Sequence, residues 1–125
     1  MATVLVVDDE PLIRTMMALI LQQEGFFVLT ADGGPEAISV SQSHPGAIDL
    51  LVTDVVMPGM DGPTLAAKLQ NDDPGMSVLL MSGYCESAQL DRCKQFDLLP
   101  KPFAMCDLLV KVHSLLRDDV LQVVA

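Results

Sequence analysis

Tryptophan is absent from the sequence, and its 125 residues include a single tyrosine and four phenylalanines. Because half of the residues are hydrophobic, the core must consist mainly of aliphatic side chains and methionine. No apolar run approaches the ~20 residues that a membrane-spanning helix requires, and the N-terminus lacks the charged and apolar segments of a signal peptide. The sequence therefore predicts one cytoplasmic domain without membrane insertion.

Basic residues are also scarce. Seven Lys and Arg stand against 17 Asp and Glu, which gives a net charge of −10. An acidic surface repels the phosphates of nucleic acids, so we expect no direct nucleic-acid binding. The three cysteines, Cys85, Cys93 and Cys106, are odd in number and lack CxxC spacing, which argues against a disulfide framework or a structural zinc site. Free thiols in a reducing compartment are the simpler interpretation.

Short apolar segments alternate with longer amphipathic ones. Thr3 to Val7 is β-branched and continuously apolar, as in a strand covered on both faces. Pro11 suits the first turn of a following helix, and Gly25 suits its end. The same alternation predicts strands at Phe27 to Ala31, Leu50 to Thr53, Ser77 to Met81 and Asp97 to Leu99, and helices from Gly34, from Gly62, over Ser87 to Gln95 and over Ala104 to Arg117.

Five such units predict an α/β domain over residues 1–117. Its sheet would be doubly wound and flavodoxin-like, with five parallel strands in the order 2-1-3-4-5 and helices on both faces. Residues 118–125 either extend the last helix or form a linker stub.

Polar residues stand at or just beyond the carboxyl ends of the predicted strands. Asp8 and Asp9 follow the first strand and Asp54 the third. Ser82 follows the fourth strand and Lys101 the fifth. The crevice of an open α/β sheet lies outside the carboxyl ends of its strands, where the strand order reverses. That point falls between the first and third strands, so we expect the three acids to converge there.

Converging carboxylates raise each other's pKa, and a hard cation relieves the repulsion. Carboxylate and carbonyl oxygens suit Mg²⁺, and no His or Cys stands beside these acids to favour zinc. We predict Asp9 and Asp54 as direct Mg²⁺ ligands. We expect the backbone carbonyl of Val56 to be a third ligand and Asp8 to act through water.

A cation beside Asp54 also permits nucleophilic chemistry. The Asp54 carboxylate can attack a phosphoryl group and form an acyl phosphate. Lys101 would place positive charge on the transferred oxygens, and the Ser82 hydroxyl would donate a hydrogen bond to them. Phosphoryl transfer depends mostly on such positioning and charge stabilisation.

Four motifs, in this order, resemble the receiver domains of two-component response regulators. They are V-V-D-D-E-P at 6–11, D-V-V-M-P-G-M-D-G at 54–62, M-S-G-Y at 81–84 and L-P-K-P-F at 99–103. The last two are especially similar to receivers attached to hybrid histidine kinases. Each motif follows a predicted strand, and together they extend the resemblance over nearly the whole chain.

The resemblance implies a CheY-like fold and a phosphorelay function. Asp54 would be the phosphoacceptor, Asp8 and Asp9 the acidic Mg²⁺ pocket, Ser82 the hydroxyl that follows the phosphoryl group, and Lys101 its ion-pair partner. The Lys101-Pro102 bond would be cis, and the loop at 57–59 would cover the site. The partner would be a histidine kinase or a histidine phosphotransfer protein, and the domain a monomer or weak dimer.

Leu98 departs from the family pattern. Receivers usually carry an aromatic residue three positions before the Lys, and Phe96 does not match that position. Leu98 favours an alternative, a phosphorylation-independent interaction module on the same fold. The retained acids, with Ser82 and Lys101, favour the phosphoacceptor.

Two other chemistries fit the residues less well. A Mg²⁺ phosphohydrolase would need a second carboxylate where Val56 stands. A flavin site would need a phosphate cradle after the first strand, where Asp8, Asp9 and Glu10 would repel the phosphate.

Residues outside the crevice have simpler expected roles. Asp61 suits a helix cap before Gly62. Leu12, Met16 and Leu19 widen the apolar face of the first helix beyond the ~100° stripe that packing needs. We expect this excess to mark a partner-binding face.

Overall fold

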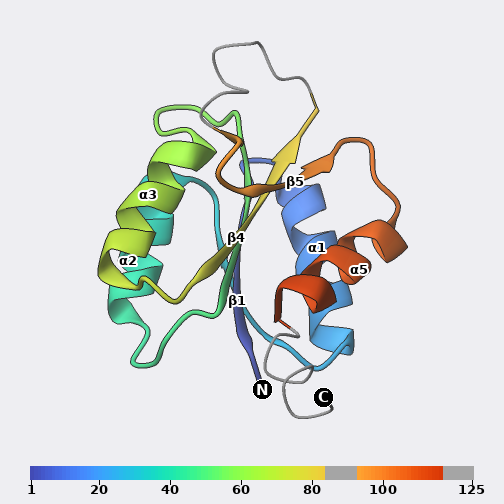
Figure 1. Ribbon diagram of the computed structural model, residues 1–125, viewed down its shortest axis with the longest axis horizontal. Helices are drawn as coiled ribbons and strands as arrows, with labels where there is room; N and C mark the ends of the chain where they lie inside the picture. Colours follow the sequence, from blue (N-terminus) through green and yellow to red (C-terminus); the bar gives the residue numbers. More distant parts are fainter. Residues whose placement is uncertain (84–92, 117–125) are drawn as a thin grey trace.

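Five parallel strands form the central sheet of the computed structural model, which describes residues 1–83 and 93–116 (Figure 1). The strands are β1 (Thr3–Val7), β2 (Phe27–Ala31), β3 (Leu50–Asp54), β4 (Ser77–Ser82) and β5 (Asp97–Pro100). Their order is β2-β1-β3-β4-β5, and each neighbouring pair is parallel. The predicted order is confirmed, and so is the first residue of every strand. The last three strands each end one residue later than expected.

Helices cover both faces of the sheet. They are α1 (Pro11–Gln23), α2 (Gly34–Ser43), α3 (Gly62–Asp72) and α5 (Met105–Leu116). Figure 1 shows α2 and α3 on one side and α1 and α5 on the other. The helix expected over Ser87 to Gln95 lies mostly outside the described residues, as do 117–125. No helix within 1–83 or 93–116 is long and apolar enough to cross a membrane.

The sheet separates two largely aliphatic cores. Alternate residues of β1 point to opposite faces, so Leu5 and Val7 join the core under α2 and α3, whereas Val4 and Val6 join the core under α1 and α5. All four are fully buried, which explains why β1 is apolar at every position. The expected aliphatic core is confirmed.

Local signals fix where two helices begin and end. Asp61 is the N-cap of α3, and its Oδ1 accepts a hydrogen bond from the Thr64 N–H at 2.9 Å, as predicted for a cap. Gly25 follows α1 with a φ of 96°, a left-handed conformation that glycine adopts at little cost. The Asp61 cap therefore lies in the loop that follows the carboxyl end of β3, whereas Gly25 lies at the opposite edge of the sheet, just before β2 begins.

Candidate functional site

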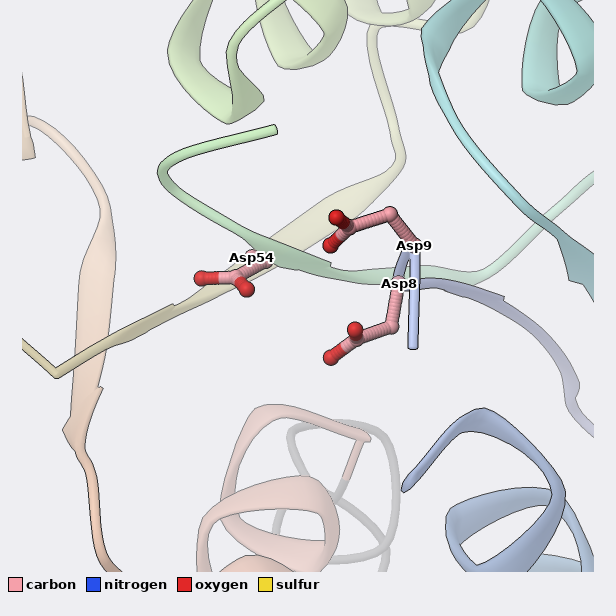
Figure 2. A group of neighbouring side chains, drawn as sticks. All are labelled: Asp8, Asp9 and Asp54. Carbon is pink, nitrogen blue, oxygen red and sulfur yellow. The ribbon is translucent and has the colours of Figure 1, made fainter. Parts of the chain in front are cut away.

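Asp8, Asp9 and Asp54 meet at the carboxyl ends of β1 and β3 (Figure 2). One carboxylate oxygen from each lies within 4.8 Å of the others. Val7 pairs with Thr53 in the sheet, so the residues that follow them emerge side by side. The convergence predicted from the strand order is therefore present in the structure.

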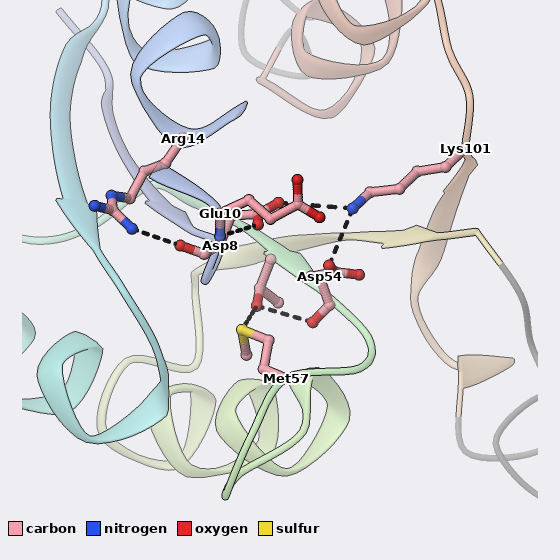
Figure 3. A network of polar contacts seen from close by, with 7 residues as sticks. Asp8, Glu10, Arg14, Asp54, Met57 and Lys101 are labelled. Carbon is pink, nitrogen blue, oxygen red and sulfur yellow. Dashed lines mark hydrogen bonds and ion pairs between the residues drawn. The ribbon is translucent and has the colours of Figure 1, made fainter. Parts of the chain in front are cut away.

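Lys101 extends from the end of β5 toward these acids (Figure 3). Its Nζ donates a hydrogen bond to Asp54 Oδ2 at 3.0 Å and lies 3.6 Å from Asp8 Oδ2. The Lys101-Pro102 peptide bond is cis, as the resemblance implied. The Lys101 main chain is anchored on β4, where its N–H donates to the Ser82 carbonyl oxygen at 2.8 Å. Ser82 and Lys101 are thus neighbours on the rim of the acidic site.

Asp8 is fully buried, and its Oδ2 atom has no hydrogen-bond partner within the described part of the chain. A buried carboxylate oxygen without a donor is costly, and Lys101 Nζ at 3.6 Å supplies charge but no hydrogen bond. All the side-chain atoms that could bind a metal here are carboxylate oxygens, and one of them lacks a hydrogen-bond partner. Such a site matches the preference of Mg²⁺ for carboxylates and waters. The residues present therefore fit a magnesium ion.

Burial is the main influence on the Asp54 carboxyl and raises its pKa. The hydrogen bond and charge of Lys101 act in the opposite direction without reversing the effect, and the charges of Asp8 and Asp9 raise the pKa further. Burial tends to lower the pKa of Lys101, but its bond to Asp54 and the nearby acids outweigh this and raise it. Lys101 is thus held in its charged form beside a carboxylate whose ionisation is disfavoured.

The family model of the response regulator receiver domain matches residues 4–113. The chain belongs to this family. It is 40% identical over 121 residues to the sensor kinase CckA of Brucella abortus, covering 94% of this chain and 13% of that protein. The receiver protein CpdR of the same organism is 30% identical over 119 residues, covering 93% of this chain and 98% of that protein. The chain therefore spans a small part of one relative and nearly all of another.

The solved structure of another receiver supports the same family assignment. The response regulator TrrA of Thermotoga maritima, in complex with Mg²⁺-BeF, superimposes on this chain with a TM-score of 0.80 at 32% identity. The superposition covers 92% of this chain and 99% of TrrA. Both the predicted family and the predicted fold are confirmed.

The loop after β3 follows the candidate acceptor Asp54 directly. Val56, whose carbonyl is a predicted Mg²⁺ ligand, is the second residue of this loop and is 55% exposed. Met57 is buried beside Thr53, and Gly59 turns the loop with a φ of 83°. The ligand role of the Val56 carbonyl stays a prediction.

Sequence reasoning missed the site role of Gly62, which it treated as the start of a helix. A Cβ added to Gly62 would clash with the Asp54 carbonyl oxygen. The Gly62 N–H also donates to the Val55 carbonyl at 2.8 Å. Only a glycine lets α3 begin this close to the main chain of the candidate acceptor.

Arg14 was missed as well. From the first turns of α1 its Nη1 donates to the Asp8 carbonyl oxygen at 2.8 Å (Figure 3). An arginine six residues after an acid carries no pattern that would have identified this bond.

Leu98 occupies the position that is usually aromatic in receivers. It pairs with Leu80 in the sheet and packs, partly buried, against the core under α2 and α3. Phe96 packs against the same core. An aliphatic side chain therefore fills the place where the family pattern puts a ring.

Proposed function

We propose that this receiver accepts a phosphoryl group on Asp54 from a phosphohistidine, with Mg²⁺ bound beside it. The observation that carries the proposal is the meeting of Asp8, Asp9 and Asp54 within 4.8 Å, with the Lys101 ammonium 3.0 Å from Asp54. Asp9, Asp54 and the Val56 carbonyl would hold the ion, and Asp8 would act through water. When bound, the cation offsets the repulsion between these acids and the incoming phosphoryl oxygens.

Asp54 is the nucleophile in this proposal. One of its carboxylate oxygens bonds to phosphorus as the bond between phosphorus and the histidine nitrogen breaks, and the electron pair stays on that nitrogen. Lys101 already contacts Asp54 and can shift its bond to a phosphoryl oxygen. Ser82 is next to Lys101 on the rim, and its hydroxyl can donate a hydrogen bond to a second phosphoryl oxygen. Attack of water on phosphorus later releases inorganic phosphate and restores Asp54, so the chain catalyses both steps of its own cycle.

The modification would act as a switch. A phosphoryl group adds close to two negative charges at the crevice, and Lys101 and Ser82 are placed to respond. One observation favours a second candidate, an interaction module that works without phosphorylation: Leu98 provides no aromatic ring to reorient. The two candidates differ in whether Asp54 is modified at all.

The donor would dock on α1. Leu12, Met16 and Leu19 are 77%, 43% and 55% exposed, which fits the predicted apolar face. A groove lined by Met16 and Phe103 continues from this face to Lys101. A helix that carries a phosphohistidine could therefore bind the apolar face and reach the acceptor.

Incubation with Mg²⁺ and a small acyl phosphate or amidophosphate, followed by intact-mass measurement, tests the proposal. We expect a gain of one phosphoryl group that maps to Asp54, is blocked by EDTA and is absent from Asp54→Asn. Asp97→Asn, which removes an exposed acid at the start of β5, is the matched control and should still be modified. If the mass of the parent chain does not increase, the result would support the interaction module instead. Steady hydrolysis of a simple phosphate ester would favour a phosphohydrolase.

A further inference from the structure

The turn that carries two of the three acids is anchored at Asp8. The Asp8 N–H donates to the Ala31 carbonyl of β2 at 3.3 Å, and Asp8 Oδ1 accepts from the Glu10 N–H at 2.9 Å. The Asp8 carbonyl oxygen accepts from Arg14 Nη1 at 2.8 Å. Arg14 therefore completes a set of hydrogen bonds that fixes the main chain of the turn.

The Asp8 carbonyl needs this partner because β1 ends at Val7 and Asp8 is fully buried. An unpaired buried carbonyl is costly, and the start of α1 offers few other bonds. Its N-cap, Glu10, makes no side-chain cap, and Pro11 has no N–H. Arg14 joins helix to turn twice, since its own N–H also donates to the Glu10 carbonyl at 3.0 Å.

The atom that Arg14 binds matters for the site. Figure 3 shows Arg14 and Lys101 on opposite sides of Asp8. Lys101 contacts carboxylate oxygens, whereas Arg14 contacts a main-chain oxygen. Arg14 thus holds the turn without occupying an oxygen that a cation would use.

We propose that Arg14 is a positioning residue for the cation site, which it serves by fixing the turn that presents Asp8 and Asp9. The inference rests on the proposed function, because it assumes that these acids hold Mg²⁺. Groups that orient metal ligands from behind often change metal affinity by about 10-fold or more when they are removed.

Charge and geometry make opposite predictions for Arg14→Gln. If Arg14 contributed only its positive charge, its removal would strengthen the attraction of the acids for Mg²⁺. If Arg14 orients the turn, its removal weakens Mg²⁺ binding. The sign of the change in affinity therefore separates the two roles.

The experiment is a Mg²⁺ titration of the full chain followed by amide NMR shifts. The variants are Arg14→Gln and the control Lys68→Gln, which removes an exposed positive charge from α3. We expect Arg14→Gln to bind Mg²⁺ about 10-fold more weakly than the parent chain and Lys68→Gln to match the parent. Arg14→Lys, which can still donate to the carbonyl, should recover part of the loss. Arg14→Met, which keeps the apolar stem, provides a second measurement if Arg14→Gln does not fold.

Phosphorylation gives an independent readout. Arg14→Gln should need about 10-fold more Mg²⁺ for the half-maximal rate, and its rate at saturating Mg²⁺ should stay close to the parent's. Unchanged or tighter Mg²⁺ binding by the Arg14 variants would overturn the inference. A parent chain that binds Mg²⁺ but gains no phosphoryl group would instead overturn the proposed function, and the titration would still decide the role of Arg14.

Discussion

Replacing Asp54 by Asn should stabilise the metal-free protein. The side chain of Asp54 is only 14% exposed, and it shares its site with Asp8 and Asp9. Asn keeps nearly the same shape without the charge. The substitution therefore removes a partly buried charge and its repulsion from two neighbours, and it loses the ion pair with Lys101.

Distances in the site give the size of the effect. At an effective dielectric constant of about 20, charges at the 4.8 Å limit of this cluster repel by about 3.5 kcal/mol, and the Lys101–Asp54 pair at 3.0 Å attracts by about 5.5 kcal/mol. The two repulsions on Asp54 together exceed this attraction by on the order of 1–2 kcal/mol. A gain of this size would raise Tm by about 3–8 °C for a domain of this length.

The pH dependence follows from the raised pKa of Asp54, which is due chiefly to burial. The folded chain keeps this proton over a pH range in which the unfolded chain, with a carboxyl pKa of about 3.9, has released it. In that range the folded state binds more protons than the unfolded state. The parent therefore loses stability as the pH rises through the range, and it does not regain that stability at higher pH. The advantage of Asp54→Asn should therefore be small at acidic pH and complete at neutral pH.

Thermal unfolding in EDTA and in excess Mg²⁺ is the assay. Magnesium at 100 times its Kd would stabilise the parent by about 2.7 kcal/mol, which exceeds the advantage of the variant and should reverse the order of the two Tm values. Asp97→Asn corrects for the general loss of one negative charge. A variant that is less stable than the parent in EDTA at neutral pH, or whose advantage does not change with Mg²⁺, would show that the Asp54 charge does not destabilise the metal-free site.

Three further predictions concern the acceptor and its surroundings. Lys101→Met should slow phosphorylation by a small donor about 100-fold, because it removes the charge nearest Asp54, and should leave Mg²⁺ binding unchanged or tighter; an unchanged rate in a rapid-quench assay would contradict this. Gly62→Ala should lower the free energy of unfolding in urea by about 1–3 kcal/mol, since its Cβ would meet the Asp54 carbonyl, and an unmoved midpoint would argue against that contact. Leu12→Glu should slow transfer from a histidine donor protein at least about 10-fold while sparing transfer from a small donor. Val110→Glu, at a 68% exposed position on α5, is its control, and equal rates would remove α1 from the docking surface.

Much of the fold could be predicted because covered parallel strands are apolar at every position. The third and fourth strands were predicted one residue short because a polar residue was taken as the end of each strand. Asp54 continues the ladder opposite Met81, and Ser82 continues it opposite Pro100. Main-chain pairing with the neighbouring strand, rather than hydrophobicity, decides where these strands end.

The meeting of the acids with Lys101 could be predicted because parallel strands bring their carboxyl ends to one edge. The roles of Arg14 and Gly62 could not. Each depends on how a helix approaches a turn or strand in space, through a bond to a main-chain oxygen or a contact that admits no Cβ. Contacts of this kind produce no characteristic spacing of residue types that could be recognised in the sequence.

In the proposed site, Asp9 and the acceptor Asp54 share one cation. A crystal structure of the parent chain grown with Mg²⁺ tests it most directly. We expect a six-coordinate ion that contacts both carboxylates and the Val56 carbonyl, with water between the ion and Asp8. A structure at saturating Mg²⁺ in which the two carboxylates point apart with no ion between them would contradict it.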